Sequence, residues 1–287
     1  MTDMIYELLE SLDLTEIEPG RFQAPHVQDD TGRLVVFGGE LLGQAIVAAT
    51  RAMPDKRVKS VQTIFARGID ARRPADIRLE PMHEGRNLGS TTVTFSQDGR
   101  LCARSLVLLD VWEPDLVRHQ PEMPVVPAPE ESRATEHSLA APETIIIGDV
   151  DILDPTLTGP PTLQLWVRFK GAPAGDAAVA RALLAYATDG WLIGTATRPH
   201  AGIGQSMAHK EISTGVVSHA VIFHEEFDAN EWLLLDHEAV FAGGGRCYGK
   251  GNVFTETGTL VATFTQEALL RHFPGGQDPR GKEATVF

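Results

Sequence analysis

Asp189 and Gln266 are the residues whose types and positions could activate a water molecule. A comparison of the two halves of the sequence singles them out: the segment GGELLG, which begins at Gly38, aligns with DGWLIG, which begins at Asp189. In the last strand expected for each half, Val107 corresponds to Gln266. A positioned carboxylate can act as a general base, and an amide can orient the water. Because both polar residues fall in the second half, we interpret them as parts of one site.

Each of these residues also has a structural interpretation. The alignment places Asp189 at the start of a helix, where Asp is a favourable N-cap and the helix dipole favours an anion. The functional alternative is a base held beside unsatisfied N–H groups that can stabilise an oxyanion. Gln266 could instead satisfy backbone groups at a sheet edge. The occurrence of both residues in the same half favours a shared site.

The elements that must position these residues follow from apolar periodicity. Residues 5–12 have the spacing of an amphipathic helix, and residues 38–53 are apolar around most of a helix that ends before Pro54. Gly43 lies inside this second helix, where glycine costs about 1 kcal/mol relative to Ala, and therefore indicates that another backbone comes close. Alternating residues predict four strands, at 57–67, 75–84, 88–97 and 101–110, with a hairpin turn at Asp98-Gly99.

The same order of elements recurs in the second half of the chain. SVQTIF at 60–65 aligns with SHAVIF at 218–223, and DGRLCA at 98–103 aligns with TGTLVA at 257–262. Between the halves, Pro and acidic residues replace any apolar period, which is typical of a linker. We therefore predict a tandem duplication with an N-terminal unit, a linker, a C-terminal unit and a flexible tail, at residues 1–112, 113–142, 143–273 and 274–287.

Composition narrows the class of protein further. The 287-residue chain has a formal net charge of −14, which argues against nucleic acid as a partner. Its two cysteines are too few for a disulfide framework, and its acidic N-terminus lacks a secretory pattern, so we expect a cytoplasmic protein. No apolar run approaches the ~18 residues of a membrane span. His219 and His224 face opposite sides of an expected strand, so we expect no metal site.

With these residues in place, the chain resembles the acyl-CoA thioesterase II family, whose members carry two fused hot-dog units. The resemblance implies an α+β double hot-dog fold, in which an antiparallel sheet wraps a long helix in each unit. It also implies hydrolysis of fatty acyl-CoA to free fatty acid and CoA, without a cofactor. The matching segments occur in the same order and are VFGGELLGQA at 36–45, LAYATD at 184–189, RPHAG at 198–202, FH at 223–224, NEWLL at 230–234 and QEALLR at 266–271.

In that family an Asp, a Gln and a hydroxyl hold the attacking water. The Asp carries over to Asp189 and the Gln to Gln266. The hydroxyl position is occupied here by Val216, which cannot orient water. Thr214 and Ser218 lie two residues to either side and are expected to share its face of the strand. We predict Ser218 as the substitute; the alternative for this hydroxyl is simple cross-strand pairing.

The remaining expectations concern substrate binding. Backbone N–H groups at Gly38, Gly39 or Gly190 are the expected oxyanion donors. Because CoA is polyanionic, the acidic chain must concentrate positive charge locally. The candidates for contacts with CoA are Arg67, Arg86, Arg246 and Lys250.

Two other functions fit the same fold. One is an acyl-CoA binding protein with weak or no catalysis, which is consistent with Val216. The other is an enoyl-CoA hydratase or dehydratase, which would need an Asp/His pair on one helix; no His follows Asp189 before His200. Sheet edges in hot-dog units usually pair with another unit, and the resemblance implies a homodimer or a higher homo-oligomer.

Overall fold

The computed structural model describes residues 2–25, 34–132, 141–273 and 276. In this part of the chain the strands form one antiparallel sheet, in the order β1-β2-β4-β5-β6-β3-β9-β12-β11-β10-β8-β7. The first half contributes β1 (Thr15–Glu18), β2 (Arg21–Gln23), β3 (Arg57–Phe65), β4 (Asp76–Glu84), β5 (Leu88–Gln97) and β6 (Arg100–Asp110). The second half contributes β7 (Glu143–Ile146), β8 (Thr162–Arg168), β9 (Ile212–Phe223), β10 (Leu233–Gly243), β11 (Arg246–Thr255) and β12 (Leu260–His272).

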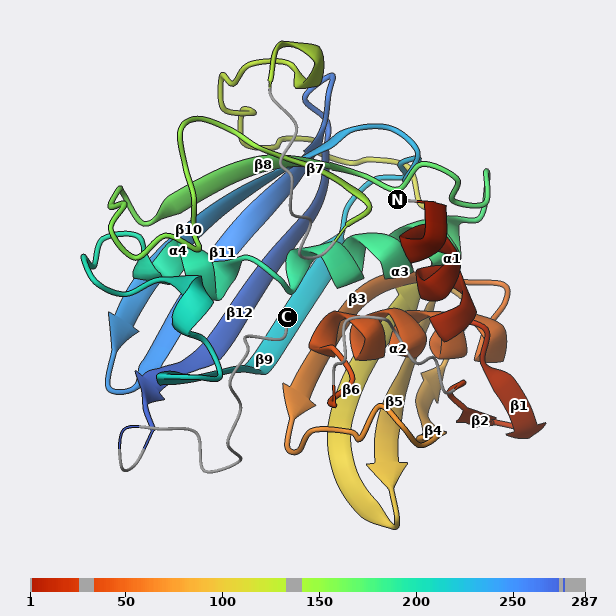
Figure 1. The fold of residues 1–287 in the computed structure, drawn as a ribbon. Helices are drawn as coiled ribbons and strands as arrows, with labels where there is room; N and C mark the ends of the chain where they lie inside the picture. Colours follow the sequence, from red (N-terminus) through yellow and green to blue (C-terminus); the bar gives the residue numbers. More distant parts are fainter. Residues whose placement is uncertain (1, 26–33, 133–140, 274–275, 277–287) are drawn as a thin grey trace.

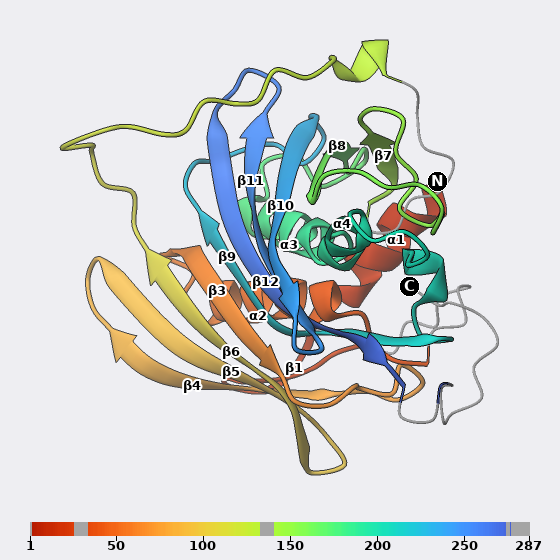
Figure 2. The same cartoon turned by 90° about the vertical axis from the view of Figure 1, so that its left-hand side faces the viewer.

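The two halves meet at the centre of the sheet, where β3 pairs with β9. The helices lie together on one side of the curved sheet (Figures 1 and 2). They are α1 (Thr2–Ser11), α2 (Gly38–Ala52), α3 (Ala177–Thr188) and α4 (Leu192–Thr197). There are also two short 3₁₀ turns in the described residues, η1 (Pro129–Glu131), which lies apart from these helices at the top of Figure 2, and η2 (Gln205–Met207). Among the described residues, none of the helices is long and apolar enough to cross a membrane.

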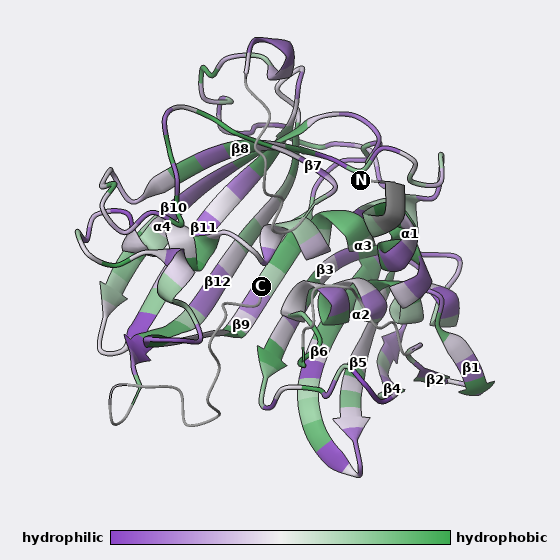
Figure 3. Ribbon diagram, viewed as in Figure 1, coloured by the Kyte–Doolittle hydropathy of each residue, from purple (hydrophilic) through white to green (hydrophobic). Residues whose placement is uncertain are grey.

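Alternating side chains explain why these strands wrap the helices. In β5, every second residue is buried and its neighbours are more exposed, so one face of the strand packs on the helical side. Figure 3 shows the resulting alternation of hydrophobic and hydrophilic bands along several strands. The four strands predicted for the first half are confirmed as β3 to β6, with bounds within two residues of those expected.

Helices α2 and α3 pack closely and run in opposite directions. A Cβ added at Gly39 would lie 2.7 Å from the backbone oxygen of Tyr186, and one at Gly43 would lie 3.3 Å from the oxygen of Ala182. The close approach predicted from Gly43 is therefore confirmed. As a consequence, the beginning of α2 lies against the end of α3.

The prediction that a helix begins at Asp189 is wrong. Asp189 is the C-cap residue of α3, which begins twelve residues earlier. Its start is fixed by Asp176, whose carboxylate accepts hydrogen bonds from the N–H groups of Ala178 and Val179. The Ala- and Leu-rich sequence that follows favours a helix, which ends at the short turn before α4.

The expected linker has little regular structure in its described part, in which η1 is the one helical turn and no strand occurs. Met123 and Val126 pack against a cluster around Trp166, and the Trp166 indole donates a hydrogen bond to the Pro127 carbonyl at 3.0 Å. The unit boundaries remain a prediction. The expected tail, 274–287, lies outside the described residues except for Gly276.

Candidate functional site

Asp189 lies at the junction between the two halves, with its carboxylate almost fully buried. It lines a cavity of about 470 Å³, a size typical of small-molecule sites. Both halves contribute to the wall, which is mostly apolar. The lining residues are Leu34 to Gly38, Leu41, Phe65 to Ile69, Asp189, Gly190, Ile193, Gln205, Ala208, His209, Thr214 to Val217 and Leu269.

The Oδ1 atom of Asp189 is held by two side chains from the sheet. Nε2 of Gln266 donates to it at 2.8 Å and also donates to the Asp189 carbonyl at 3.2 Å. Nδ1 of His219 lies 2.8 Å from the same Oδ1; because a carboxylate only accepts, this nitrogen is the donor. The structure thus brings together Asp189 and Gln266, which the sequence comparison selected.

His219 is a member of this cluster that our sequence analysis did not select. It is fully buried on β9, directly opposite Gln266 on β12. Its Nε2 lies 3.1 Å from the Thr188 hydroxyl, so both ends of the ring are held. A signal was present in the sequence: when the segments SVQTIF and SHAVIF are aligned, Val61 of the first half corresponds to His219 of the second. This is the same contrast between an apolar and a polar residue that identified Gln266.

The Oδ2 atom of Asp189 makes no hydrogen bond among the described residues and faces the start of α2. A Cβ added at Gly38 would lie only 2.7 Å from this oxygen, so glycine is required there. The N-cap residue Phe37 supplies no side-chain cap, and the first N–H groups of a helix lack intrahelical partners. The site therefore combines an available carboxylate oxygen with the positive end of a long helix.

The prediction for Ser218 is not supported by its position. The pairing of β9 with β12 has a bulge, because Ser218 pairs with Glu267 but Val216 pairs with Ala268. The extra residue, Val217, breaks the alternation, so Thr214 and Val216 line the cavity and Ser218 does not. Ser218 shares the outer face with the exposed Glu267.

The glycines expected to donate to an oxyanion differ in their setting. Gly38 lines the cavity at the start of α2, whereas Gly39 is pressed against the backbone of Tyr186. Gly190 also lines the cavity, but it follows the end of α3 and does not begin a helix. Gln205 donates to its carbonyl at 3.4 Å.

Of the basic residues expected to bind CoA, Arg67 lines the cavity. It is exposed and donates to the Leu101 carbonyl at 2.8 Å. The other three do not line it: Arg86 lies in the β4–β5 turn, Arg246 at the β10–β11 turn, and Lys250 pairs with Glu238 at 3.3 Å.

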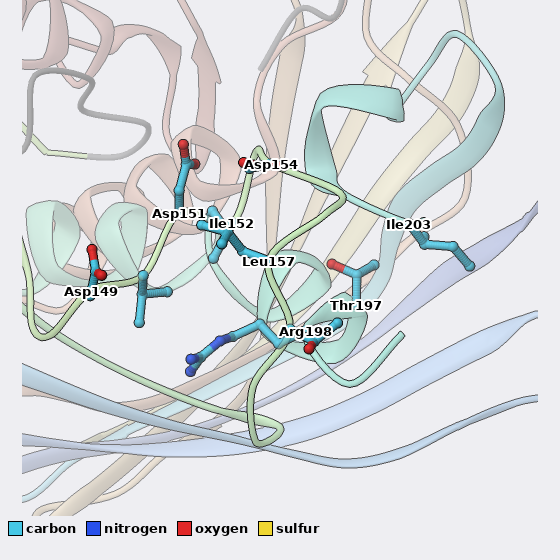
Figure 4. Close-up of a pocket in the computed structure, with 10 residues that line it drawn as sticks. Asp149, Asp151, Ile152, Asp154, Leu157, Thr197, Arg198 and Ile203 are labelled. Carbon is cyan, nitrogen blue, oxygen red and sulfur yellow. The ribbon is translucent and has the colours of Figure 1, made fainter. Parts of the chain in front are cut away.

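A second hollow lies near the start of the second half (Figure 4). Asp149, Asp151 and Asp154 line it together with Arg198. Its volume is about 20 Å³, which is room for about one water molecule. Among the described residues, no group of three or more His, Cys, Asp or Glu side chains is arranged to hold a metal ion. The large cavity is therefore the candidate substrate site.

Comparison with known proteins agrees with this architecture. The family model for the acyl-CoA thioesterase N-terminal domain matches residues 26–109, and the model for the C-terminal domain matches residues 116–270. The chain is 29% identical to acyl-CoA thioesterase 2 of Haemophilus influenzae, over 94% of this chain and 99% of that protein. It is 28% identical to acyl-coenzyme A thioesterase 8 of Homo sapiens, over 92% of this chain and 88% of that protein.

Solved structures give the same result. The crystal structure of an acyl-CoA thioesterase II from Mycobacterium marinum has a TM-score of 0.77 at 28% identity, covering 94% of this chain and 99% of that one. Each half of the chain is a sheet that wraps a long helix, and two such units fused in one chain make a double hot-dog protein. The buried carboxylate of Asp189 lies where the two units meet. The chain belongs to the acyl-CoA thioesterase family.

Proposed function

We propose that this protein hydrolyses fatty acyl-CoA to the free acid and CoA, with Asp189 as the general base. The observation that carries the assignment is the asymmetry of the Asp189 carboxylate. Oδ1 is fixed by His219 and Gln266, while Oδ2 is available at the cavity. A base held in one orientation needs no rearrangement before it accepts a proton.

In this reaction Oδ2 of Asp189 takes a proton from a water molecule as the water oxygen bonds to the thioester carbonyl carbon. The carbonyl oxygen becomes an oxyanion, which the backbone N–H of Gly38, at the cavity, stabilises. When the intermediate collapses, the C–S bond breaks and the CoA sulfur takes the proton from Asp189. Water supplies both the new acid oxygen and the thiol hydrogen, so no covalent enzyme intermediate is needed.

Gln266 acts in this scheme by holding the base. Its Nε2 holds Asp189, and its Oε1 is a buried acceptor with no partner among the described residues. Gln266 does not line the cavity, so we propose that it positions the water through the carboxylate of Asp189, which it holds. Ser218 does not line the cavity, and Thr214, which does, pairs with Leu270, four residues from Gln266. Our scheme therefore gives the water no hydroxyl partner from β9.

The test is the release of free thiol from a panel of acyl-CoA chain lengths, followed with a thiol reagent. Asp189→Asn should lower kcat by at least about a hundredfold, because a general base typically contributes 10² to 10⁴ in rate. Asp55→Asn, at an exposed position, is the matched control and should leave kcat unchanged. Turnover of Asp189→Asn within threefold of wild type would exclude Asp189 as the base. Acyl-CoA binding without thiol release by wild type would indicate the binding-protein alternative.

The hydratase alternative has no support in the site. It would need an Asp/His pair on one helix, whereas the His that contacts Asp189 is His219 on strand β9, which is fully buried with both ring nitrogens engaged by Asp189 and Thr188. We therefore keep thioester hydrolysis as the function.

Our proposals for the cellular setting are a cytoplasmic enzyme of fatty acid metabolism that acts as a homodimer or larger homo-oligomer. Cys102 and Cys247 are both free and buried, which suits a reducing compartment. Arg67, at the cavity, is our candidate for contact with a CoA phosphate.

A further inference from the structure

Strand β9 has an unpaired edge at the cavity. On one side it pairs with β12 along its whole length, from Ile212 to Phe223. On the other side its pairing with β3 covers only Ser218–Ile222. The chain after β3 turns away, because the N–H groups of Ala66 and Arg67 both donate to the Cys102 carbonyl. Among the described residues, no other segment pairs with the edge of residues 213–217.

The backbone groups at this edge can be assigned by alternation. The Ile212 carbonyl accepts a hydrogen bond from the His209 N–H at 2.9 Å, on the side away from β12. In an antiparallel ladder, alternate residues direct both backbone groups to the same side. The N–H and C=O groups of Thr214 and Val216 therefore also point away from β12. His209 lines the cavity, so these groups point into it.

The lining of the cavity supports this assignment. Before the bulge at Val217, three consecutive residues, Thr214 to Val216, all line it, although successive residues of a strand face opposite sides. A cavity that lies against the edge of a strand touches both faces, whereas a cavity under one face touches only alternate residues. The wall beside Asp189 is thus an open row of backbone donors and acceptors.

We propose that this edge binds the pantetheine arm of acyl-CoA as an added strand. The proposal rests on the proposed function, since it assumes that the thioester lies at Asp189. The arm carries two amides in an extended chain, which is the chemistry that a strand edge recognises. The amide next to the sulfur pairs with the backbone of Val216, and the following amide pairs with that of Thr214.

Distances along the strand agree with this placement. Val216 pairs with Ala268, which is two residues from Gln266, or about 7 Å along β12. In the arm, one sulfur and two methylenes separate the thioester carbonyl carbon from the first amide nitrogen. When extended, these atoms span a distance similar to that along β12. Thr214 lies two residues further from Asp189, in the direction in which the arm continues. The acyl group is not involved, so the edge recognises the thiol portion whatever the chain length.

The first experiment changes only the arm. The same acyl group is attached to pantetheine and to a pantetheine analogue in which the amide next to the sulfur is replaced by an ester, which removes one N–H. A hydrogen bond typically contributes a factor of about two to ten, so kcat/KM should fall by up to about tenfold for this analogue. Equal kcat/KM for the amide and the ester would overturn the proposal.

The second experiment changes only the edge. Val216→Pro removes one N–H that points into the cavity, and proline is tolerated at strand edges. Val216→Ala is the matched control, because it alters the side chain and keeps the N–H. Val216→Pro should hydrolyse acyl-pantetheine several-fold more slowly than Val216→Ala. With an acyl-ethanethiol ester, which has no amide, the two variants should be equal; the same difference on both substrates would overturn the proposal.

Failure of the proposed function can be told apart from failure of this inference. If wild type does not hydrolyse acyl-CoA, the proposed function is wrong. Calorimetric binding of acyl-pantetheine and its ester analogue to Asp189→Asn still decides the inference. Tighter binding of the amide supports pairing at the edge, and equal binding excludes it. If the circular dichroism spectrum shows that Val216→Pro is not folded, the comparison of the amide and ester substrates alone decides whether the edge binds the arm.

Discussion

At the scale of single residues, the two oxygens of Asp189 have separate tasks. Oδ1 is bound by His219 and Gln266, and Oδ2 is left for the substrate side. His219 does not line the cavity, so any effect it has on the reaction passes through Asp189. It is therefore a positioning residue in our scheme.

Paired variants of His219 test this role. His219→Leu removes the donor to Oδ1, whereas the shorter amide in His219→Asn can place an N–H close to the position of Nδ1. Hydrogen bonds to charged groups contribute about 1.5–3 kcal/mol, so kcat should fall by about tenfold or more in the Leu variant and be largely restored in the Asn variant. KM should stay near wild type in both, because neither side chain reaches the substrate. Equal losses of kcat in both variants would contradict the role.

We expect His237 to affect stability, and it does not line the cavity. It is buried on β10 against the ring of Phe264, at a centroid distance of 5.0 Å. Burial lowers the pKa of His237 to about 3, from its ordinary value of 6.5. Between these two pKa values the unfolded chain binds one proton more than the native protein. The contribution of His237 to the free energy of unfolding is therefore fully present above pH 6.5 and is lost as the pH decreases.

Urea unfolding at pH 7.5 and pH 5.0 measures this effect. One proton corresponds to about 1.4 kcal/mol per pH unit, so His237 should account for about 2 kcal/mol of the stability lost by pH 5.0. His237→Leu should show a correspondingly smaller difference between the two conditions. His83→Leu, at an exposed position, should keep the wild-type pH dependence. An unchanged pH dependence in His237→Leu would show that this side chain is not the titrating group.

At the scale of elements, the site depends on how closely the start of α2 approaches the end of α3. Gly38→Ala would place a methyl group 2.7 Å from Asp189 Oδ2, and a shift of the carboxylate by about 1 Å can cost on the order of a hundredfold in rate. Gly38 is the first residue of α2, and the thermal midpoint reports separately whether the fold tolerates the added methyl group. Gly215→Ala adds a methyl to the same cavity with nothing within 4 Å and should keep wild-type kcat with an acyl-ethanethiol ester, which has no arm to contact residue 215. Wild-type kcat in Gly38→Ala would show that this packing does not fix the base.

The elements also show what the sequence could reveal. The strands of the first half were predictable because alternation and the Asp98-Gly99 turn are local signals. Asp189 and Gln266 were found because one half of a duplicated chain keeps polar residues where the other is apolar. The predicted strand face of Ser218 was wrong because a single extra residue, Val217, reverses the alternation of side chains. A bulge of this kind leaves no pattern in the local sequence. The helix start was wrong because repeat alignment ignored Asp176 and the alanine-rich segment after it.

At the scale of the whole molecule, the outer face of the central strands carries several exposed apolar side chains, in a chain of charge −14. Scattered exposed apolar residues are normal, but a contiguous group marks an interaction site. Here neighbouring strands β6, β3 and β9 carry four large side chains that are each 40–52% exposed: Ile64, Leu106, Leu108 and Ile222. We propose that a second copy of this chain covers this outer face.

Charge at the borders of the outer face fits a two-fold dimer. Arg104, Ile64, Ser218 and Glu267 lie in one row across β6, β3, β9 and β12. Arg104 and Glu267 are both exposed. A two-fold axis along the junction of β3 and β9 would bring Arg104 of each copy opposite Glu267 of the other. A symmetric contact of this kind is self-complementary.

Charge reversal at these two positions provides the test of the dimer. In Glu267→Arg, each Arg104 would face another arginine, so the dimer should dissociate. Adding Arg104→Glu exchanges the two charges and should restore the dimer, because the pairing is the same with the signs reversed. Light scattering at micromolar concentration distinguishes the species, since one chain has a mass of 31.1 kDa. A wild-type mass of one chain would exclude the dimer, and a dimer in the single variant that matches wild type would place the contact elsewhere on the molecule.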